Sequence, residues 1–175
     1  MVLTSVLSII LVTQNDPKQS VSLVGSGLKL SISVPTVVDG WKLKRSRTDT
    51  TSKLEYVHSS LTAFGKPCVF SVDFRSKATA AKLFQAEKSA LTQPKPSTTN
   101  LKLEWRWDGW QFLEREMGTP QGIQIKFVGE ADSLFVLGSL TYPGPLERLT
   151  TNKLVAVMSR LTRAAIPNGK TKAQL

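Results

Sequence analysis

The chain carries one histidine and one cysteine, so few of its side chains could perform nucleophilic or metal chemistry. His58 and Cys68 are ten positions apart, on segments that we predict to be neighbouring strands. This spacing permits a Cys–His pair, but no third group that would position the pair is evident. Cys68 alternates with Phe70, Val72 and Phe74 on one strand face, which predicts a buried, inert thiol. Zinc would lack its nitrogen and sulfur ligands. We therefore expect no catalytic residue, no metal and no cofactor.

Four carboxylates cluster in the only acidic segment of the chain: Glu114, Glu116, Glu130 and Asp132. Glu114 and Glu116 alternate along a predicted strand and so share a face, where they could bind a divalent cation weakly. The simpler interpretation is a solvated sheet face opposed to Lys126. The sequence contains no phosphate-binding glycine loop, nucleophile elbow or zinc-protease helix. These features favour a protein that is not an enzyme.

The basic residues are more informative, because 23 Lys and Arg outnumber 13 Asp and Glu and give a net charge of +10. Such a charge attracts nucleic acid, anionic lipid, acidic polysaccharide or an acidic protein, although it could also serve only to keep the protein soluble. We expect a basic and aromatic surface that engages an acidic protein partner. Its candidate residues are Trp41, Lys42, Lys44, Arg45, Arg47, Arg106, Trp110, Arg160 and Arg163.

Three tryptophans leave a second kind of partner open. Trp105, Trp107 and Trp110 are interleaved with basic residues such as Arg106, and rings beside cations are used to bind single-stranded nucleic acid. The alternative is that Trp105 and Trp107 fill the core while Arg106 faces water. Trp110 follows a turn and is expected to be the exposed one. A nucleic-acid-binding module is therefore the alternative function.

The amino-terminal segment begins with an apolar run from Val2 to Val12. The run is shorter than the roughly 20 residues that span a bilayer, and it suits the apolar core of a secretory signal peptide. The predicted targeting segment and linker cover residues 1–27, and the rival interpretation is a first strand of the domain. We expect an exported protein (periplasmic, secreted or luminal) without a transmembrane span.

In the rest of the chain, apolar residues recur with one of two spacings. Segments in which every second residue is apolar predict strands, and two segments with the spacing of a helix predict helices. The predicted strands are 28–34, 54–60, 69–74, 101–107, 110–117, 123–128 and 133–142. The predicted helices are 78–91 and a closing amphipathic helix that starts at Leu146 and has apolar positions up to Leu161.

This order of elements predicts one α+β domain over residues 28–167, followed by a flexible tail, 168–175. Its centre is expected to be an antiparallel sheet of about six to seven strands, because the links between the later strands are short. Two main helices are expected to flank the sheet.

Short phrases within this order resemble the PsbP-like (Mog-type) fold family. The segment Leu30-Ser31-Ile32-Ser33-Val34-Pro35, followed by Gly40-Trp41-Lys42, is similar to that family's opening strand, and Ser139-Leu140-Thr141-Tyr142 precedes the closing helix. The family includes the extrinsic photosystem II protein PsbP, a Ran-binding nuclear protein and small exported bacterial proteins. The resemblance implies roles in binding and assembly and transfers no catalytic residue. We therefore expect a non-enzymatic, exported binding or accessory domain.

Overall fold

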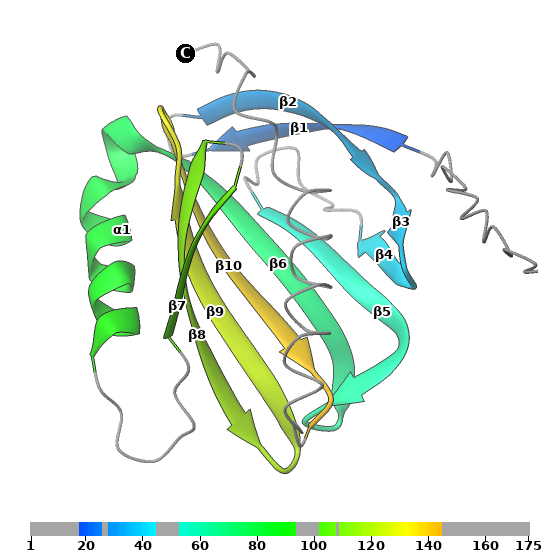
Figure 1. Ribbon diagram of the computed structural model, residues 1–175. Coiled ribbons are helices and arrows are strands. Elements are labelled where there is room, and N and C mark those ends of the chain that lie inside the picture. The colour runs from blue at the N-terminus through cyan, green and yellow to red at the C-terminus, as the bar shows by residue number, and fades with distance from the viewer. Residues whose placement is uncertain (1–17, 26–27, 45–52, 94–101, 108, 145–175) are drawn as a thin grey trace, which may run out of the picture.

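The computed structural model describes residues 18–25, 28–44, 53–93, 102–107 and 109–144. These residues form strands and one helix, α1 (Figure 1). The strands are β1 (Lys18–Gly25), β2 (Leu28–Pro35), β3 (Val37–Val38), β4 (Trp41–Lys44), β5 (Lys53–Ala63), β6 (Lys66–Ser76), β7 (Lys102–Trp107), β8 (Trp110–Thr119), β9 (Gly122–Glu130) and β10 (Leu134–Tyr142). The helix α1 spans Lys77–Thr92.

Eight of the strands form one antiparallel sheet in the order β3-β4-β5-β6-β10-β9-β8-β7, and β1 pairs with β2 in a separate hairpin. Most neighbours in the sheet are consecutive in the chain, as short links between antiparallel strands require. The exception is the pairing of β6 with β10, which joins the two halves of the sheet. The centre of the sheet therefore depends on a long-range contact.

The larger hydrophobic core lies on the face of the sheet away from α1. Alternate residues of β5, β6, β8, β9 and β10 point into it, as the period of a strand dictates. Ile32 and Val34 of β2 join this core, so the β1–β2 hairpin and α1 lie on opposite faces of the sheet (Figure 1). Phe70 stacks on Phe127 with 6.0 Å between ring centroids, and both side chains are almost fully buried.

Helix α1 covers part of the other face. Ser76 caps its start, because the Ser76 side chain accepts a hydrogen bond from the Ala78 amide at 3.3 Å. The buried helix positions Ala80, Phe84 and Leu91 pack on residues of β8, β9 and β10. Phe84 stacks on Phe135 at 3.9 Å between ring centroids. The helix contacts the half of the sheet around β8–β10 and the end of β6, and β4 and β5 extend beyond it (Figure 1).

Several predicted elements are confirmed. The helix predicted at 78–91 is α1, and the seven predicted strands correspond to β2, β5, β6, β7, β8, β9 and β10. Gly109 has a φ of +81°, which fits its place in the tight link between β7 and β8.

The predicted fold class is wrong. The described part of the chain is mostly antiparallel sheet with a single helix, and it is not a sheet flanked by two main helices. Among the described residues, strands supply most of the burial, and β2 joins the larger core through Ile32 and Val34. The closing helix predicted from Leu146 and the tail 168–175 lie outside the described residues.

Two further segments differ from the predictions. The basic stretch that starts at Trp41 is not among the predicted strands, but Trp41–Lys44 forms β4 and pairs with β5. β1 lies within residues 1–27, which were assigned to a targeting segment and linker, and it pairs with β2 along its whole length. Neither strand was predicted, because neither contains a long segment in which apolar and polar residues alternate.

Candidate functional site

His58 has a structural position in the strand β5. Its Nδ1 accepts hydrogen bonds from the amides of Ser60 at 3.2 Å and Leu61 at 3.0 Å. These bonds hold the irregularity that interrupts the pairing of β5 with β6 after Val57. The His58 ring also packs edge-on against Trp41, with 5.1 Å between centroids. The imidazole nitrogen that would act as a base is thus already bonded to the backbone.

Cys68 is fully buried in the larger core, as predicted. Burial raises the pKa of its thiol to about 11, so the reactive thiolate is scarce at neutral pH. His58 and Cys68 therefore do not combine into a nucleophilic pair that solvent can reach.

The two tryptophans among the candidate partner-binding residues are not on the surface. Trp41 is 1% exposed and Trp110 is 2% exposed, and both belong to the larger core. The expectation that Trp110 is exposed is wrong. Trp110 stacks at 5.9 Å on Phe112, because both lie on the core side of β8. Neither ring is available to a partner.

A polar surface remains where α1 does not cover the sheet. Strand register places one row of residues across it, from Lys44 through Glu55, Ser71 and Ser139 to Lys126. We call this surface the open face. It consists of Lys42, Lys44, Lys53, Glu55, Val57, Val69, Ser71, Asp73, Arg75, Lys126, Ser139 and Thr141, all half-buried or exposed.

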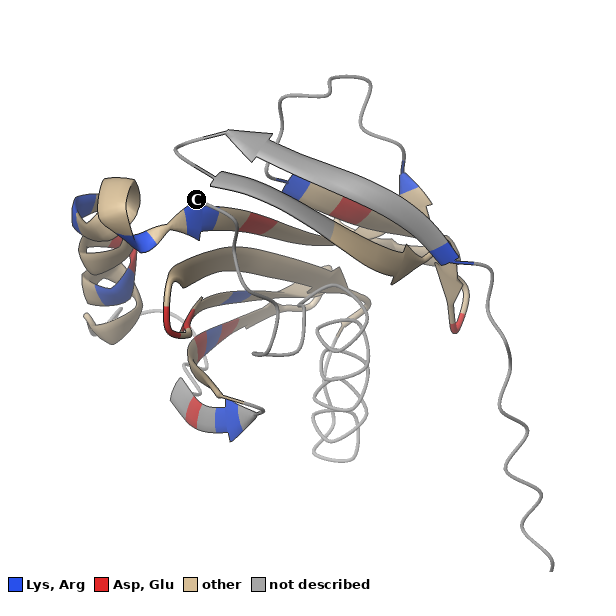
Figure 2. Ribbon diagram, turned by 90° about the horizontal axis from the view of Figure 1, so that it is seen from above, with Lys and Arg blue, Asp and Glu red and all other residues tan. Residues whose placement is uncertain are grey.

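The open face carries five cations and two carboxylates. Glu55 lies 3.1 Å from Lys44 Nζ and 3.2 Å from Lys53 Nζ, and Asp73 pairs with Arg75 at 2.5 Å. Figure 2 shows basic residues in blue and acidic residues in red along the described strands. Partial burial alone would raise the pKa of Glu55, but the two lysines outweigh burial and hold this pKa below its ordinary value. Each carboxylate is thus already matched by a cation.

The centre of the open face is built from small hydroxyl side chains. Ser71 Oγ and Ser139 Oγ lie 3.1 Å apart, and Thr141 Oγ1 accepts a hydrogen bond from the Val69 amide at 2.8 Å. Lys42 and Lys126 flank this area and form no ion pair with another described residue. The surface is therefore largely polar and net positive.

The residues that the sequence analysis proposed for partner binding do not lie together in the structure. Lys42 and Lys44 lie on the open face, and Arg106 is exposed on β7 at the opposite edge of the sheet. The arginines at positions 45, 47, 160 and 163 lie outside the described residues. Sequence reasoning missed Lys53, Arg75 and Lys126, although each occupies the polar phase of an alternating strand.

Glu114 and Glu116 of β8 form neither the cation site nor the solvated face that the sequence suggested. Glu114 pairs in register with Phe127, and Glu116 pairs with Ile125, so both lie on the core side of the sheet. Lys126 lies on the other side, next to Arg115. Glu114 is 4% exposed, and burial raises the pKa of Glu116. They do not form a solvated face opposed to Lys126.

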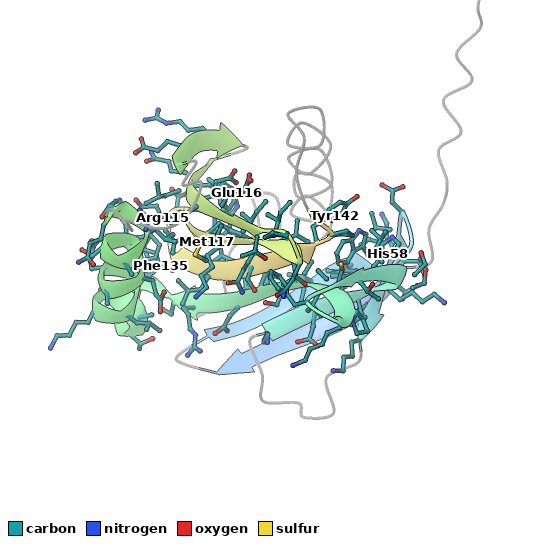
Figure 3. The ribbon with its side chains drawn as sticks, turned by 90° about the horizontal axis from the view of Figure 1, so that it is seen from below. His58, Arg115, Glu116, Met117, Phe135 and Tyr142 are labelled. Atoms are coloured by element: carbon teal, nitrogen blue, oxygen red, sulfur yellow. The ribbon has the colours of Figure 1, made fainter. Side chains whose placement is uncertain are left out.

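Arg115 connects α1 to the sheet from the same side as Lys126. Its guanidinium donates to the Ala90 carbonyl at 3.3 Å and to the Gln93 carbonyl, at the carboxyl end of α1. Figure 3 shows Arg115 and Phe135 beside α1, with His58 at the far end of the sheet. Arg115 is 4% exposed, so it serves the fold rather than a partner.

Two general properties complete the description. Within the described ranges, no three His, Cys, Asp or Glu residues come together as potential metal ligands. The helix in those ranges is not long and apolar enough to cross a membrane.

Comparison with known proteins gives no relative: no family model matches the chain, and no curated protein matches it. The resemblance to the PsbP-like family therefore stays a prediction.

Proposed function

We propose that this protein is a non-enzymatic binding or accessory domain whose open face engages the acidic surface of a protein partner. The observation that carries the proposal is the charge of that face, where five cations outnumber two carboxylates. Complementary charge accelerates encounter and selects among partners. We further propose that the protein works outside the cytoplasm, because of the apolar run from Val2 to Val12.

The geometry of the open face supports a protein partner. Its strands present a row of short side chains, Ser71 and Ser139, between the lysines of β4 and β9. Short side chains allow another folded surface to approach the strands closely, whereas a binding site for a small molecule is usually concave. The positions of His58 and Cys68 inside the fold support binding rather than catalysis.

Nucleic acid has less support. Unpaired bases are usually held by stacking on exposed aromatic rings. The open face contains no aromatic residue, and the Trp110 ring is buried. Nucleic acid is therefore an outcome of the test and not the proposal.

The experiment measures binding of poly-L-glutamate to the full chain by titration calorimetry at low and at moderate salt. We expect binding that weakens as salt increases, since the contacts are ionic. The variant Lys42→Glu/Lys126→Glu should bind about tenfold more weakly, because it reverses two cations that have no described ion pair. The matched control is Lys82→Glu, at an exposed position of α1 away from the open face.

Three results would overturn the proposal. The first is no binding of poly-L-glutamate at low salt, and the second is an equal loss of affinity in the Lys82→Glu control. The third is tighter binding of a thymidine oligonucleotide of matched charge, which would replace the protein partner with nucleic acid. Circular dichroism of each variant verifies that the sheet is retained.

A further inference from the structure

A groove runs between α1 and the edge of the sheet formed by β7 and β8. It encloses about 450 Å³, within the range of roughly 300–1,000 Å³ that is common for small-molecule sites. Its lining residues are Phe84, Lys88, Thr92, Glu104, Arg106, Gln111, Phe112, Leu113, Val128 and Glu130. It lies toward the β7 edge of the sheet, and on β9 it begins at Val128, two positions from Lys126 of the open face.

Regular spacing of residues in α1 and in β7 places the side chains that line the groove. Phe84, Lys88 and Thr92 are spaced four apart and so lie on one line along α1. Glu104 and Arg106 are spaced two apart on β7 and so share a face of that strand. The helix line and the strand face oppose each other because Leu113 of the neighbouring strand packs under α1.

The floor of the groove is apolar and rigid. Leu113 and Val128 are paired in register and are 6% and 3% exposed. Phe84 is 2% exposed and is held by its stacking on Phe135. A ligand lying here would contact an aromatic ring and two aliphatic side chains, which suits an apolar body.

The rim of the groove is charged, with a cation available for a ligand. Lys88 and Lys77 both approach Glu130, at 3.8 Å and 3.6 Å, so the charge of this carboxylate is already balanced. Arg106 is exposed, pairs across the strands with the neutral Gln111, and makes no ion pair with another described residue. A guanidinium in this position can bind a carboxylate through two hydrogen bonds.

The geometry points to a binding site for a small amphipathic carboxylate in the α1–β7 groove. Its apolar body lies on Phe84, Leu113 and Val128, and its carboxylate faces Arg106 and Lys88. The carboxylates of Glu104 and Glu130 line the same groove, so they disfavour a ligand with two or more negative charges. This site is independent of the acidic partner proposed for the open face.

The test uses decanoate as the probe, below its micellar concentration, and follows the methyl resonances of the intact protein by NMR. We expect shifts of the Leu113 and Val128 methyl groups as decanoate is added. Decyltrimethylammonium has the same chain length with a positive head, and it should bind at least tenfold more weakly. Arg106→Gln should weaken decanoate about tenfold, while Lys42→Gln on the open face should leave its affinity unchanged.

A second variant tests the groove without touching its cations. Gln111→Trp places a large ring at an exposed strand position on the groove wall, which should abolish decanoate binding while the spectrum of the core stays intact. The proposal is overturned if the methyl shifts appear only outside the groove or do not appear at all. It is also overturned if the cationic probe binds equally well, or if Arg106→Gln binds decanoate as the wild type does.

Discussion

Gly138 lies directly beneath the ring of Phe127 in the centre of the sheet. A Cβ atom at position 138 would come within 2.0 Å of Phe127 Cζ, far closer than atoms can approach. Gly138→Ala should therefore lower the free energy of unfolding by about 1–3 kcal/mol, the usual cost of overpacking a core. Urea unfolding measures this loss. Adding Phe127→Leu should recover part of it, and purely additive losses in the double variant would contradict the steric explanation.

Glu116 shows how a buried face affects a carboxylate. Burial raises its pKa above the ordinary value of a glutamate, because the ionised form is poorly solvated there. The raised pKa means that the contribution of Glu116 to stability is fully present below its unfolded pKa and is lost as pH rises through the folded pKa. Glu116→Gln should match the wild type in acid and be more stable at neutral pH. Thermal unfolding from pH 4 to 8 measures this, and a pH-independent difference would argue against it.

At the scale of elements, the end of α1 depends on a residue of the sheet. Arg115 donates to two carbonyls of the last turn, which α1 cannot satisfy itself, and its Nε has no hydrogen-bond partner among the described residues. A cation here also complements the helix dipole. Arg115→Met should therefore cost about 1–3 kcal/mol, because it removes two hydrogen bonds from a charged donor to these carbonyls.

The measurement for Arg115 is hydrogen exchange together with urea unfolding. Amides in the last turn of α1 should lose protection first, while those of β5 and β6 keep theirs. Lys82→Met on the exposed side of the same helix is the control and should change little. Equal loss of protection across the whole sheet would show that Arg115 does not act through the end of α1.

At the scale of the whole molecule, the amino-terminal segment decides where the domain begins. β1 pairs with β2, and Ile32 and Val34 of β2 belong to the larger core. We expect the exported protein to lack Val2 to Val12. A start at or before Lys18 would keep β1, whereas a start at residue 28, after the predicted targeting segment and linker, would remove it.

Mass spectrometry of the chain from separated compartments of its host tests both export and the position of the amino terminus. Recovery of a shortened chain outside the cytoplasm is the expected outcome. An intact Met1 in the cytosol would refute export, and it would include the apolar run in the working protein. The proposal for the open face does not depend on the location of the protein, so the two proposals can fail separately.

The sequence by itself determined the local structure of this protein. Alternation at Leu54–Ser60 and Val69–Phe74 predicted β5 and β6, and the helical period after Ala78 predicted α1, because these periods are properties of neighbouring residues. The burial of Cys68 followed from the same alternation. Part of the open face could also be predicted, since Lys42 and Lys44 are basic whatever the fold. The family resemblance and the closing helix stay predictions.

Only the tertiary structure decided which surfaces these elements share. The pairing of β6 with β10 brings Ser71 beside Ser139, and the further register with β9 adds Lys126 to the open face. The same register moves Glu116 to the core side and buries Trp41 and Trp110. Strand periodicity shows that two faces exist, but long-range pairing decides which residues from distant strands share a face and which face is covered. For that reason the class of fold, the open face and the α1–β7 groove required the structure.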